Sequence, residues 1–356
     1  MANQEKVGPP VDRSRDAYNH HRDALDDFWR RKSSAPVHHQ DSRIFGHQMT
    51  VTSNHPGVME AVDLATRSYS TAAPSGRDFT MRIVVDDQFR AGVDPAGHLP
   101  DEILYVGSED WLAMRVGRWG QAHVDLRAGT SVVILGPDLA SKPGLIARWI
   151  IDTIWTNFLI RSGYGMLHAT ALHRDGTLVA FVAPHDSGKS TTALRLALDR
   201  GFLLLSDSLL FVDGCPGGLR FNAFPVGRVS LRRGALDAWP HVREHAIEES
   251  IRSETKYFVD LAAFAPEHVQ RQAVCPNRIF LFLLERHDQP ETVQHQVDPK
   301  EVTDVLIANS MFYDTDSVWM TNLEWITALS EEAATSRLLI GTDTDRMLDT
   351  IERAIS

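Results

Sequence analysis

The amino-acid sequence predicts an α/β protein of two domains: an N-terminal α+β domain, then an α/β domain organised around a phosphate-binding loop. Three observations carry this prediction. The chain has 356 residues, which is long for a single hydrophobic core. Short alternating runs separated by turns fill residues 44–142. An apolar strand, a Gly-Lys-Ser loop, an amphipathic helix and a second strand follow one another at residues 177–207.

Residues 1–42 are predicted to form a polar N-terminal arm. The segment is rich in histidine and charge, with at most one short helix, around residues 16–31. Its histidine pairs lack carboxylate or cysteine companions at regular spacing, so we predict no metal site there. The polar start of the arm does not have the pattern of a signal peptide.

Residues 43–142 are predicted to form the α+β domain. A helix is expected at 55–69, and a hairpin turn at Gly117–Gly120. The expected strands are 79–87, 111–117, 121–126 and 130–136. No catalytic constellation falls in this half. Its role stays open, and recognition of a substrate or partner is a plausible one.

Residues 143–356 are predicted to form the nucleotide-binding domain, opening with a buried helix that ends at Arg161. The runs 166–173 and 177–183 indicate two strands joined by an Arg-Asp-Gly turn. A helix over 190–200 is closed by a glycine, and the next strand ends at Asp207. We expect this strand to neighbour the one before the loop, so that both ends meet at the ligand-binding edge of the sheet.

The Gly-Lys-Ser sequence has the groups that a polyphosphate requires. Gly188 permits a tight turn, Lys189 can reach the phosphates, and Ser190 can ligate Mg²⁺ together with Asp207. Ala183 stands where the usual pattern has its first glycine. That substitution, with the acidic Asp186, keeps open the alternative of a strand-to-helix turn that binds nothing. The expected nucleotide-binding residues are Pro184, His185, Asp186, Ser187, Gly188, Lys189, Ser190 and Thr191.

The run LHATALHRDGTLVAFVAPHDSGKSTTALRLALDRGFLLLSDS resembles the C-terminal catalytic domain of HPr kinase/phosphorylase and its related kinases. These proteins share a histidine on a strand, a hairpin, a P-loop, a helix and a strand with acidic residues at its end. The resemblance is looser at 221–233, 255–260 and 278–286. It implies a phosphoenolpyruvate-carboxykinase-like α/β catalytic domain, covering roughly residues 145–356.

The resemblance also implies a function: an ATP- and Mg²⁺-dependent kinase that transfers the γ-phosphoryl group to a hydroxyl. A serine of a peptide or protein is the favoured acceptor. A small-molecule hydroxyl kinase and a catalytically silent nucleotide-binding regulatory module are the alternatives. Asp207 would be the base, with His168 as its polar support and Lys189 on the phosphates. Ser208 replaces the family's second aspartate, so we expect kinase activity without phosphorolysis.

Two further cations are candidates for neutralising transferred charge, although a surface ion pair explains each equally well. They are Lys256 and Arg228.

Charge and cysteine content restrict the partners. With 36 Lys and Arg against 47 Asp and Glu, the net charge is −11, which argues against binding to nucleic acid or anionic membranes. Two cysteines far apart in the chain, Cys215 and Cys275, fit a reducing environment, so we expect a cytoplasmic protein. A homo-oligomer is compatible with the resemblance.

Overall fold

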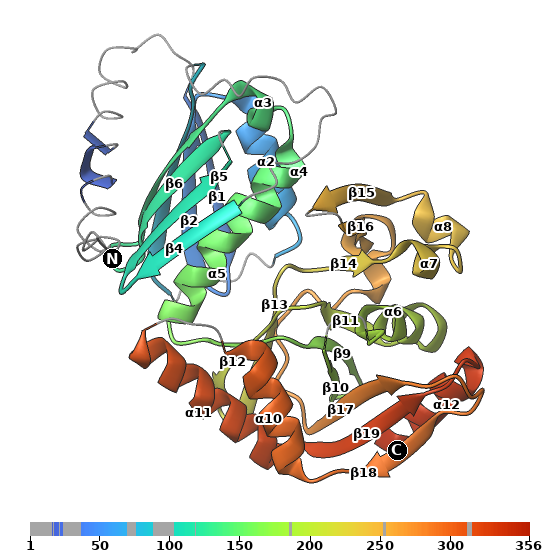
Figure 1. Ribbon diagram of the computed structural model, residues 1–356. Coiled ribbons are helices and arrows are strands. Elements are labelled where there is room, and N and C mark those ends of the chain that lie inside the picture. The colour runs from blue at the N-terminus through green and yellow to red at the C-terminus, as the bar shows by residue number, and fades with distance from the viewer. Residues whose placement is uncertain are drawn as a thin grey trace, which may run out of the picture. The chain divides into compact units, whose positions relative to one another are not determined.

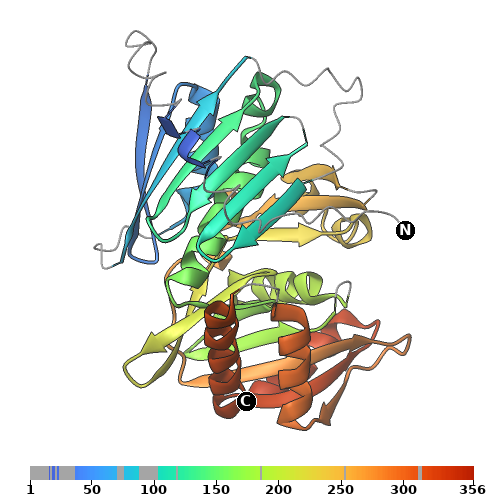
Figure 2. The same ribbon diagram turned by 60° about the vertical axis from the view of Figure 1, so that its left-hand side comes forward.

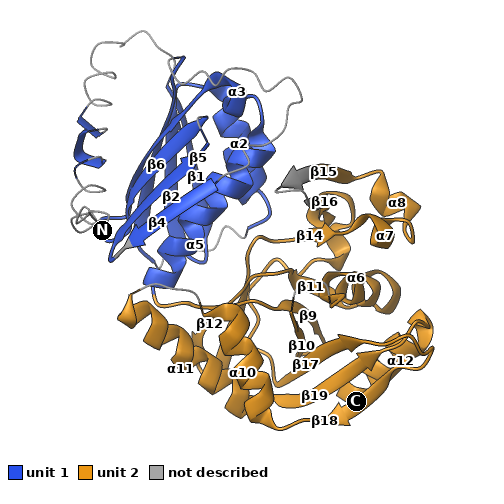
Figure 3. Ribbon diagram, in the orientation of Figure 1, with its two compact units in different colours: residues 1–162 blue, residues 163–356 orange. Residues whose placement is uncertain are grey.

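The computed structural model describes Asp16, residues 18–20 and 22–23, and residues 37–69, 76–87, 103–117, 119–184, 187–251, 254–311 and 315–356. The chain divides into two compact units, Met1–Ser162 and Gly163–Ser356 (Figure 3). Both are mixed α/β, with sheets that combine parallel and antiparallel pairs or are wholly antiparallel. Within the described residues, no helix has both the length and the apolar character needed to cross a membrane.

Unit 1 is built on a seven-stranded sheet in the order β1-β2-β3-β7-β6-β5-β4 (Figure 1). The pairs β2–β3 and β3–β7 are parallel, and the other pairs are antiparallel. The hairpin predicted at Gly117–Gly120 is confirmed, because it joins the antiparallel strands β5 and β6. The strands are β1 (His38–Ile44), β2 (His47–Ser53), β3 (Asp78–Val85), β4 (Ile103–Ser108), β5 (Trp111–Val116), β6 (Gly120–Asp125) and β7 (Thr130–Leu135).

Helices cover one face of this sheet, and Tyr18 packs on the other. On the helical face, Phe79 of β3 packs edge-on against Trp155 and Phe158, with ring centroids 5.7 and 4.9 Å away. On the opposite face, Tyr18 is only 6% exposed and donates to or accepts from Thr130 Oγ1 at 2.7 Å. The helices are α2 (Pro56–Thr66), α3 (Pro137–Ala140), α4 (Pro143–Leu145), the π-helix η1 (Ile146–Ile151) and α5 (Asp152–Arg161).

The boundaries of unit 1 differ from those expected from the sequence. The helix at 146–161 was expected to open the second domain, but its aromatic side chains bury themselves against β3, so the first unit extends to Ser162 rather than to residue 142. Strand β1 starts at His38, within the segment expected to be an arm, and pairs along its length with β2. The arm therefore contributes both a strand and the buried Tyr18 to the unit.

Unit 2 is built on a six-stranded sheet in the order β11-β9-β10-β17-β19-β18. Its central strands β10, β17 and β19 are mutually parallel. Helices α6 and α12 cover one face, and α10 and α11 cover the other (Figures 1 and 2). The strands are β9 (Thr170–Arg174), β10 (Thr177–Val182), β11 (Leu203–Ser206), β17 (Arg278–Arg286), β18 (Val293–Gln296) and β19 (Ala334–Ile340). The helices are α6 (Lys189–Arg200), α10 (Pro299–Ser310), α11 (Asp316–Glu332) and α12 (Thr344–Ile355).

Two three-stranded antiparallel sheets and several short helices complete unit 2. One sheet has the order β13-β12-β8 and the other β14-β16-β15. Their strands are β8 (Gly165–Leu167), β12 (Leu210–Cys215), β13 (Gly218–Ala223), β14 (Arg228–Leu231), β15 (Ala246–Ile251) and β16 (Glu254–Asp260). The short helices are α7 (Arg233–Leu236), α8 (Pro240–Arg243), α9 (Leu261–Phe264) and the 3-10 turn η2 (Pro266–His268).

Local sequence explains where the long helices of unit 2 begin. Asp298, Thr315 and Asp343 each precede a helix and accept a hydrogen bond from an amide of its first turn. Helix α6 differs, since Gly188 stands at its start without a side-chain cap.

Two expectations for unit 2 were wrong. The run 166–173 is not one strand: β8 and β9 belong to different sheets, and His168 lies in the break between them. Strand β11 does not neighbour β10 either, because β9 pairs with both and separates them. The Arg-Asp-Gly turn is confirmed. Asp175 and Gly176 have φ of 49° and 75° and join the antiparallel β9 and β10.

Candidate functional site

The loop between β10 and α6 turns sharply at its single glycine, Gly188. Gly188 has a φ of +96°, a region that side chains with a Cβ avoid, and α6 begins with Lys189. A methyl group at residue 188 would also lie 2.5 Å from Nη2 of Arg286. The positive φ favours glycine here, and the guanidinium group would have to move to admit a side chain. Two of the expected nucleotide-binding residues, His185 and Asp186, lie outside the described residues.

A cavity of about 790 Å³ opens at the carboxyl ends of the three parallel strands. The loop after β10 lines it with Ser187 and Gly188, β17 with Arg286, and β19 with Ile340 and the residues that follow. Parallel strands present their carboxyl ends, and the loops that follow them, at one edge of a sheet, which is where open α/β sheets bind ligands. Local topology therefore makes this edge the candidate site.

The wall of the cavity is cationic. Among the described residues, one carboxylate, Asp288, lines it, against five Lys and Arg side chains. The five are Lys189, Arg195, Arg232, Lys256 and Arg286. In a chain with a net charge of −11, this local reversal of sign favours an anionic ligand.

Asp207 lies behind the cavity wall and is held by three donors. Its Oδ1 accepts from Thr170 Oγ1 at 2.8 Å and from Ser190 Oγ at 2.7 Å, and its Oδ2 accepts from the Ser230 amide at 2.9 Å. Asp207 is 4% exposed, and Ser190 and Ser230 line the cavity in front of it. The structure thus brings Asp207 to the start of α6, although β9 separates β11 from β10.

Burial dominates the electrostatics of Asp207. Loss of water around the carboxylate raises its pKa above the ordinary 3.8. Hydrogen bonds from Ser230, Ser190 and Thr170 and the charge of Lys189 lower the pKa, but they do not cancel the effect of burial. A carboxyl with a raised pKa is a better proton acceptor than an ordinary aspartate.

Lys189 lies against its own loop. Its Nζ donates to the carbonyl oxygens of Ala183 at 2.7 Å and Pro184 at 2.9 Å, and the residue is 7% exposed. The ammonium group therefore stabilises the loop from inside. It also lines the cavity, so its charge acts on a ligand there.

His168 and Ser208 both line the cavity. The His168 amide donates to Ser310 Oγ at 2.9 Å, which fixes the break between β8 and β9 on α10. Ser208 has a φ of +73°, a conformation that costs a residue with a Cβ about 1 kcal/mol or more. The bend at Ser208 directs the chain from Asp207 into β12.

The remaining expected residues divide between the wall and its surroundings. Ser187, Thr191 and Lys256 line the cavity. Pro184 takes part through its carbonyl oxygen, which accepts from Lys189. Arg228, at the start of β14, pairs in register with Asp260 of β16 and is not among the lining residues.

Sequence reasoning missed the contribution of β17 and of two further arginines. Arg286, His287 and Asp288 follow the apolar run IFLFLLE and line the cavity beside the loop. A polar triplet at the carboxyl end of a buried parallel strand was the signal that could have found them. Arg195 of α6 and Arg232 before α7 carried no comparable signal, since their place in the wall depends on tertiary packing.

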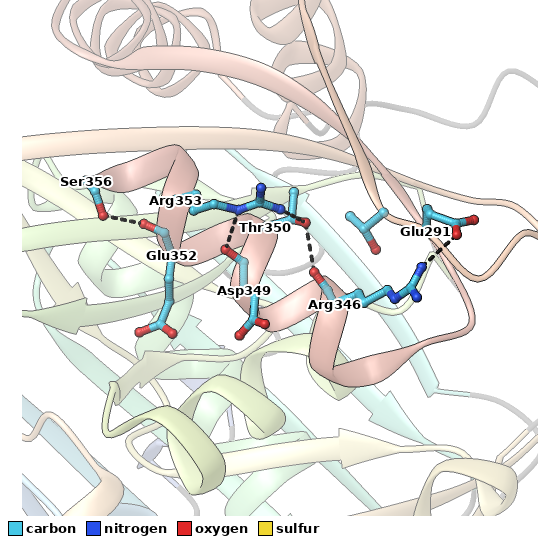
Figure 4. Close-up of a pocket in the computed structure, with 8 residues that line it drawn as sticks. Glu291, Arg346, Asp349, Thr350, Glu352, Arg353 and Ser356 are labelled. Carbon is cyan, nitrogen blue, oxygen red and sulfur yellow. Dashed lines mark hydrogen bonds and ion pairs between the residues drawn. The ribbon is translucent and has the colours of Figure 1, made fainter.

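A second groove, of about 720 Å³, runs along α12 (Figure 4). Its charges engage one another and the backbone: Arg346 pairs with Glu291 at 2.6 Å, and Arg353 donates to the Asp349 carbonyl oxygen at 3.3 Å. Three carboxylates and two guanidinium groups line the groove, so it lacks the one-sided charge of the cavity at the strand ends.

Comparison with known proteins finds a distant structural likeness. No family model matches the chain, and no curated protein does. Among solved structures, the Hpr(Ser) kinase/phosphatase from Coxiella burnetii is similar at 14% identity over 53% of this chain and 87% of that one, with a TM-score of 0.28. At such a low TM-score the likeness is distant and carries no weight for the site.

Proposed function

We propose that unit 2 binds ATP in the cationic cavity and transfers its γ-phosphoryl group to a hydroxyl. The observation that carries this proposal is the wall of five Lys and Arg side chains around the Gly-Lys-Ser loop, at the edge where three parallel strands end. A polyphosphate is the ligand that best matches a helix N-terminus, a tight glycine turn and a cluster of cations.

Two features of the start of α6, the Lys189 side chain and the backbone amides of the first turn, are assigned to the nucleotide. Lys189 holds the loop in shape through two carbonyl oxygens and places its positive charge beside the phosphates. The uncapped amides of the first turn supply donors for the same anion.

Mg²⁺ fits the oxygens at Ser190 and Asp207. A hydroxyl and a carboxylate are hard ligands, and Mg²⁺ usually takes only one or two such groups, with water and phosphate oxygens completing its shell. Within the described ranges no cluster of three His, Cys, Asp or Glu side chains is present, which fits a metal held largely by the nucleotide. When bound, the ion would neutralise phosphate charge.

Asp207 is assigned as the base that orients and deprotonates the acceptor hydroxyl. Its raised pKa suits proton acceptance, and its donors Ser190 and Ser230 line the cavity. His168, on the same wall, is assigned as a polar support for the acceptor. Lys256 lines the cavity and is a candidate to neutralise charge, whereas Arg228 would have to act from outside the wall.

A serine of a peptide or protein is the proposed acceptor, and a small hydroxylated molecule is the second candidate. The charge of the cavity wall does not favour one of these two acceptors over the other. A cytoplasmic location and independence from nucleic acid and membranes belong to the same proposal, since the net charge of −11 disfavours polyanionic surfaces.

A phosphoryl-transfer assay tests the proposal. The full chain is incubated with γ-labelled ATP and Mg²⁺, with a serine-containing peptide library in one arm and small polyols and hydroxy acids in the other. We expect label on an acceptor hydroxyl, lost in Asp207→Asn and retained in the control Asp304→Asn, whose carboxylate is exposed on the outer side of α10. ATP binding without transfer in either arm would instead identify a silent regulatory module.

A further inference from the structure

The end of strand β17 places a guanidinium group directly on the Gly-Lys-Ser loop. Nε of Arg286 donates to the carbonyl oxygen of Ser187 at 3.2 Å. A methyl group built on Gly188 would lie 2.5 Å from Nη2 and 3.0 Å from Cζ of Arg286. The planar group therefore packs on the bare α-carbon of Gly188, at the point where the loop becomes α6.

The register between β10 and β17 places Arg286 at this contact with the loop. Leu283 pairs with Val182, the last residue of β10, so β17 continues past the end of β10 and carries Arg286 over the loop. Arg286 itself pairs with Ile340 at the end of β19, and both residues line the cavity.

The surroundings of Arg286 differ from those of Arg174 and Arg337, two other arginines of this sheet. Arg174 pairs with Glu352 at 2.7 Å, and Arg337 pairs with Glu285, the neighbour of Arg286 on β17, at 3.3 Å. Among the described residues, no carboxylate lies within ion-pair distance of Arg286. Its hydrogen bond to the loop uses Nε alone and is made to a neutral carbonyl oxygen.

Arg286 also complements Lys189. The Lys189 ammonium donates to two carbonyl oxygens of its own loop. Arg286 binds the same loop from the cavity side through one nitrogen, and its two terminal nitrogens can serve a second acceptor. A guanidinium can hold two oxygens of one phosphate group in a bidentate manner, which an ammonium cannot.

We propose that Arg286 binds the polyphosphate of the nucleotide in a bidentate manner and positions the loop at Ser187 and Gly188. This inference rests on the nucleotide site proposed above and adds to it a contact supplied by β17. It assigns a ligand class, a chain of at least two phosphate groups, to a side chain outside the Gly-Lys-Ser sequence.

Titration calorimetry with the full chain tests the inference. The probes are ATP, adenosine and inorganic tripolyphosphate, and the variants are Arg286→Gln, Arg286→Lys and the control Arg278→Gln. Arg278 begins the same strand and donates to the carbonyl oxygen of Ile355, far along β17 from the loop. We expect Arg286→Gln to lower the affinity for ATP and for tripolyphosphate by at least about tenfold, because a charge-assisted bidentate pair is lost.

Arg286→Lys should recover part of that affinity, because lysine keeps the charge but lacks the paired nitrogens of the guanidinium group. Arg278→Gln should bind both phosphate ligands like the wild type. Adenosine lacks phosphate, so its affinity for each variant should equal its affinity for the wild type. Unchanged ATP and tripolyphosphate affinity in a folded Arg286→Gln variant would overturn the inference and leave the proposed function intact.

The probes also separate the two proposals. A wild type that binds tripolyphosphate in an Arg286-dependent way but not ATP would contradict the proposed function and support the inference. A wild type that binds neither would overturn both.

A second comparison tests the packing of Arg286 on Gly188. Gly188→Ala creates a clash with the guanidinium as well as backbone strain, whereas in an Arg286→Ala background the strain alone remains. We expect the loss of thermal stability caused by Gly188→Ala to be smaller in that background. Equal losses in the two backgrounds would show that Arg286 does not pack on residue 188.

Discussion

The hydroxyl of Ser190 donates a hydrogen bond of 2.7 Å to Oδ1 of Asp207, joining the first turn of α6 to the end of β11. The two residues are 17 positions apart, and β9 separates the strands that lead to them. This contact ties the proposed base to the residue proposed to meet the metal.

Replacing Ser190 by alanine should separate metal-dependent from metal-independent nucleotide binding. The variant loses a hard oxygen ligand and leaves Asp207 with one donor fewer. We expect the gain in ATP affinity that Mg²⁺ gives the wild type to fall by about tenfold, while affinity measured with EDTA changes little. Thr327→Ala, on the exposed side of α11, is the control. If Mg²⁺ strengthens binding equally in Ser190→Ala and wild type, Ser190 is not a metal ligand.

The buried carboxyl of Asp207 should make stability depend on pH in a defined direction. Its folded-state pKa is raised above 3.8, so between these two values the folded protein holds a proton that the unfolded chain has lost. The contribution of Asp207 to stability is therefore fully present below about pH 3.8 and is lost as pH rises through the raised pKa.

Urea unfolding across pH 4 to about 7 measures this dependence, with Asp207→Asn as the comparison. The difference in unfolding free energy between Asp207→Asn and wild type should shift in favour of the asparagine variant as pH rises. A difference that stays flat over the range would show that the carboxyl is not perturbed by burial.

Backbone conformation predicts opposite effects for two glycines of unit 2. Gly201 ends α6 with a φ of +69°, and no neighbouring atom lies within 4 Å of a Cβ built there. Gly201→Ala should therefore lose about 1 kcal/mol through strain alone. Gly234 in α7 also has open space but no positive φ, so Gly234→Ala should be neutral or gain up to about 1 kcal/mol. Chemical denaturation gives the free energy of unfolding of each variant. Equal changes in the two variants would show that backbone φ does not decide the effect.

Removing one hydroxyl tests the packing of the N-terminal arm. Tyr18→Phe keeps the ring that packs on Trp111 and loses the 2.7 Å hydrogen bond to Thr130. We expect a loss of about 1 kcal/mol, and a similar loss in Thr130→Val. In the double variant the losses should not add, because both remove the same bond. Additive losses would mean that the two hydroxyls do not interact.

Features coded by contiguous sequence were predictable. Gly188, Lys189 and Ser190 follow an apolar strand and precede a helix, and each of these steps is local. Asp207 could be placed near them because a strand after such a helix returns to the same edge of the sheet. The turn at Asp175 and Gly176 was also predictable from the sequence, since both residue types tolerate positive φ.

Features that depend on pairing between distant segments were not. Nothing in residues 166–173 indicates that β8 and β9 join different sheets, or that β9 inserts between β10 and β11. The helix at 146–161 is apolar enough to pack on either unit, and its tertiary contacts, among them those with Phe79 and His47, decide the choice. Arg286 reaches the loop through sheet register, which the sequence of β17 alone does not reveal.

Calorimetric titration of the full chain with ATP, set against Lys189→Ala and against adenosine, tests the central claim most directly. Lys189 both shapes the loop and charges the cavity wall. We predict saturable ATP binding that weakens with salt, a loss of at least about tenfold in Lys189→Ala, and no comparable affinity for adenosine. Equal affinity for ATP and adenosine, or ATP binding that Lys189→Ala leaves unchanged, would contradict a phosphate site at this loop.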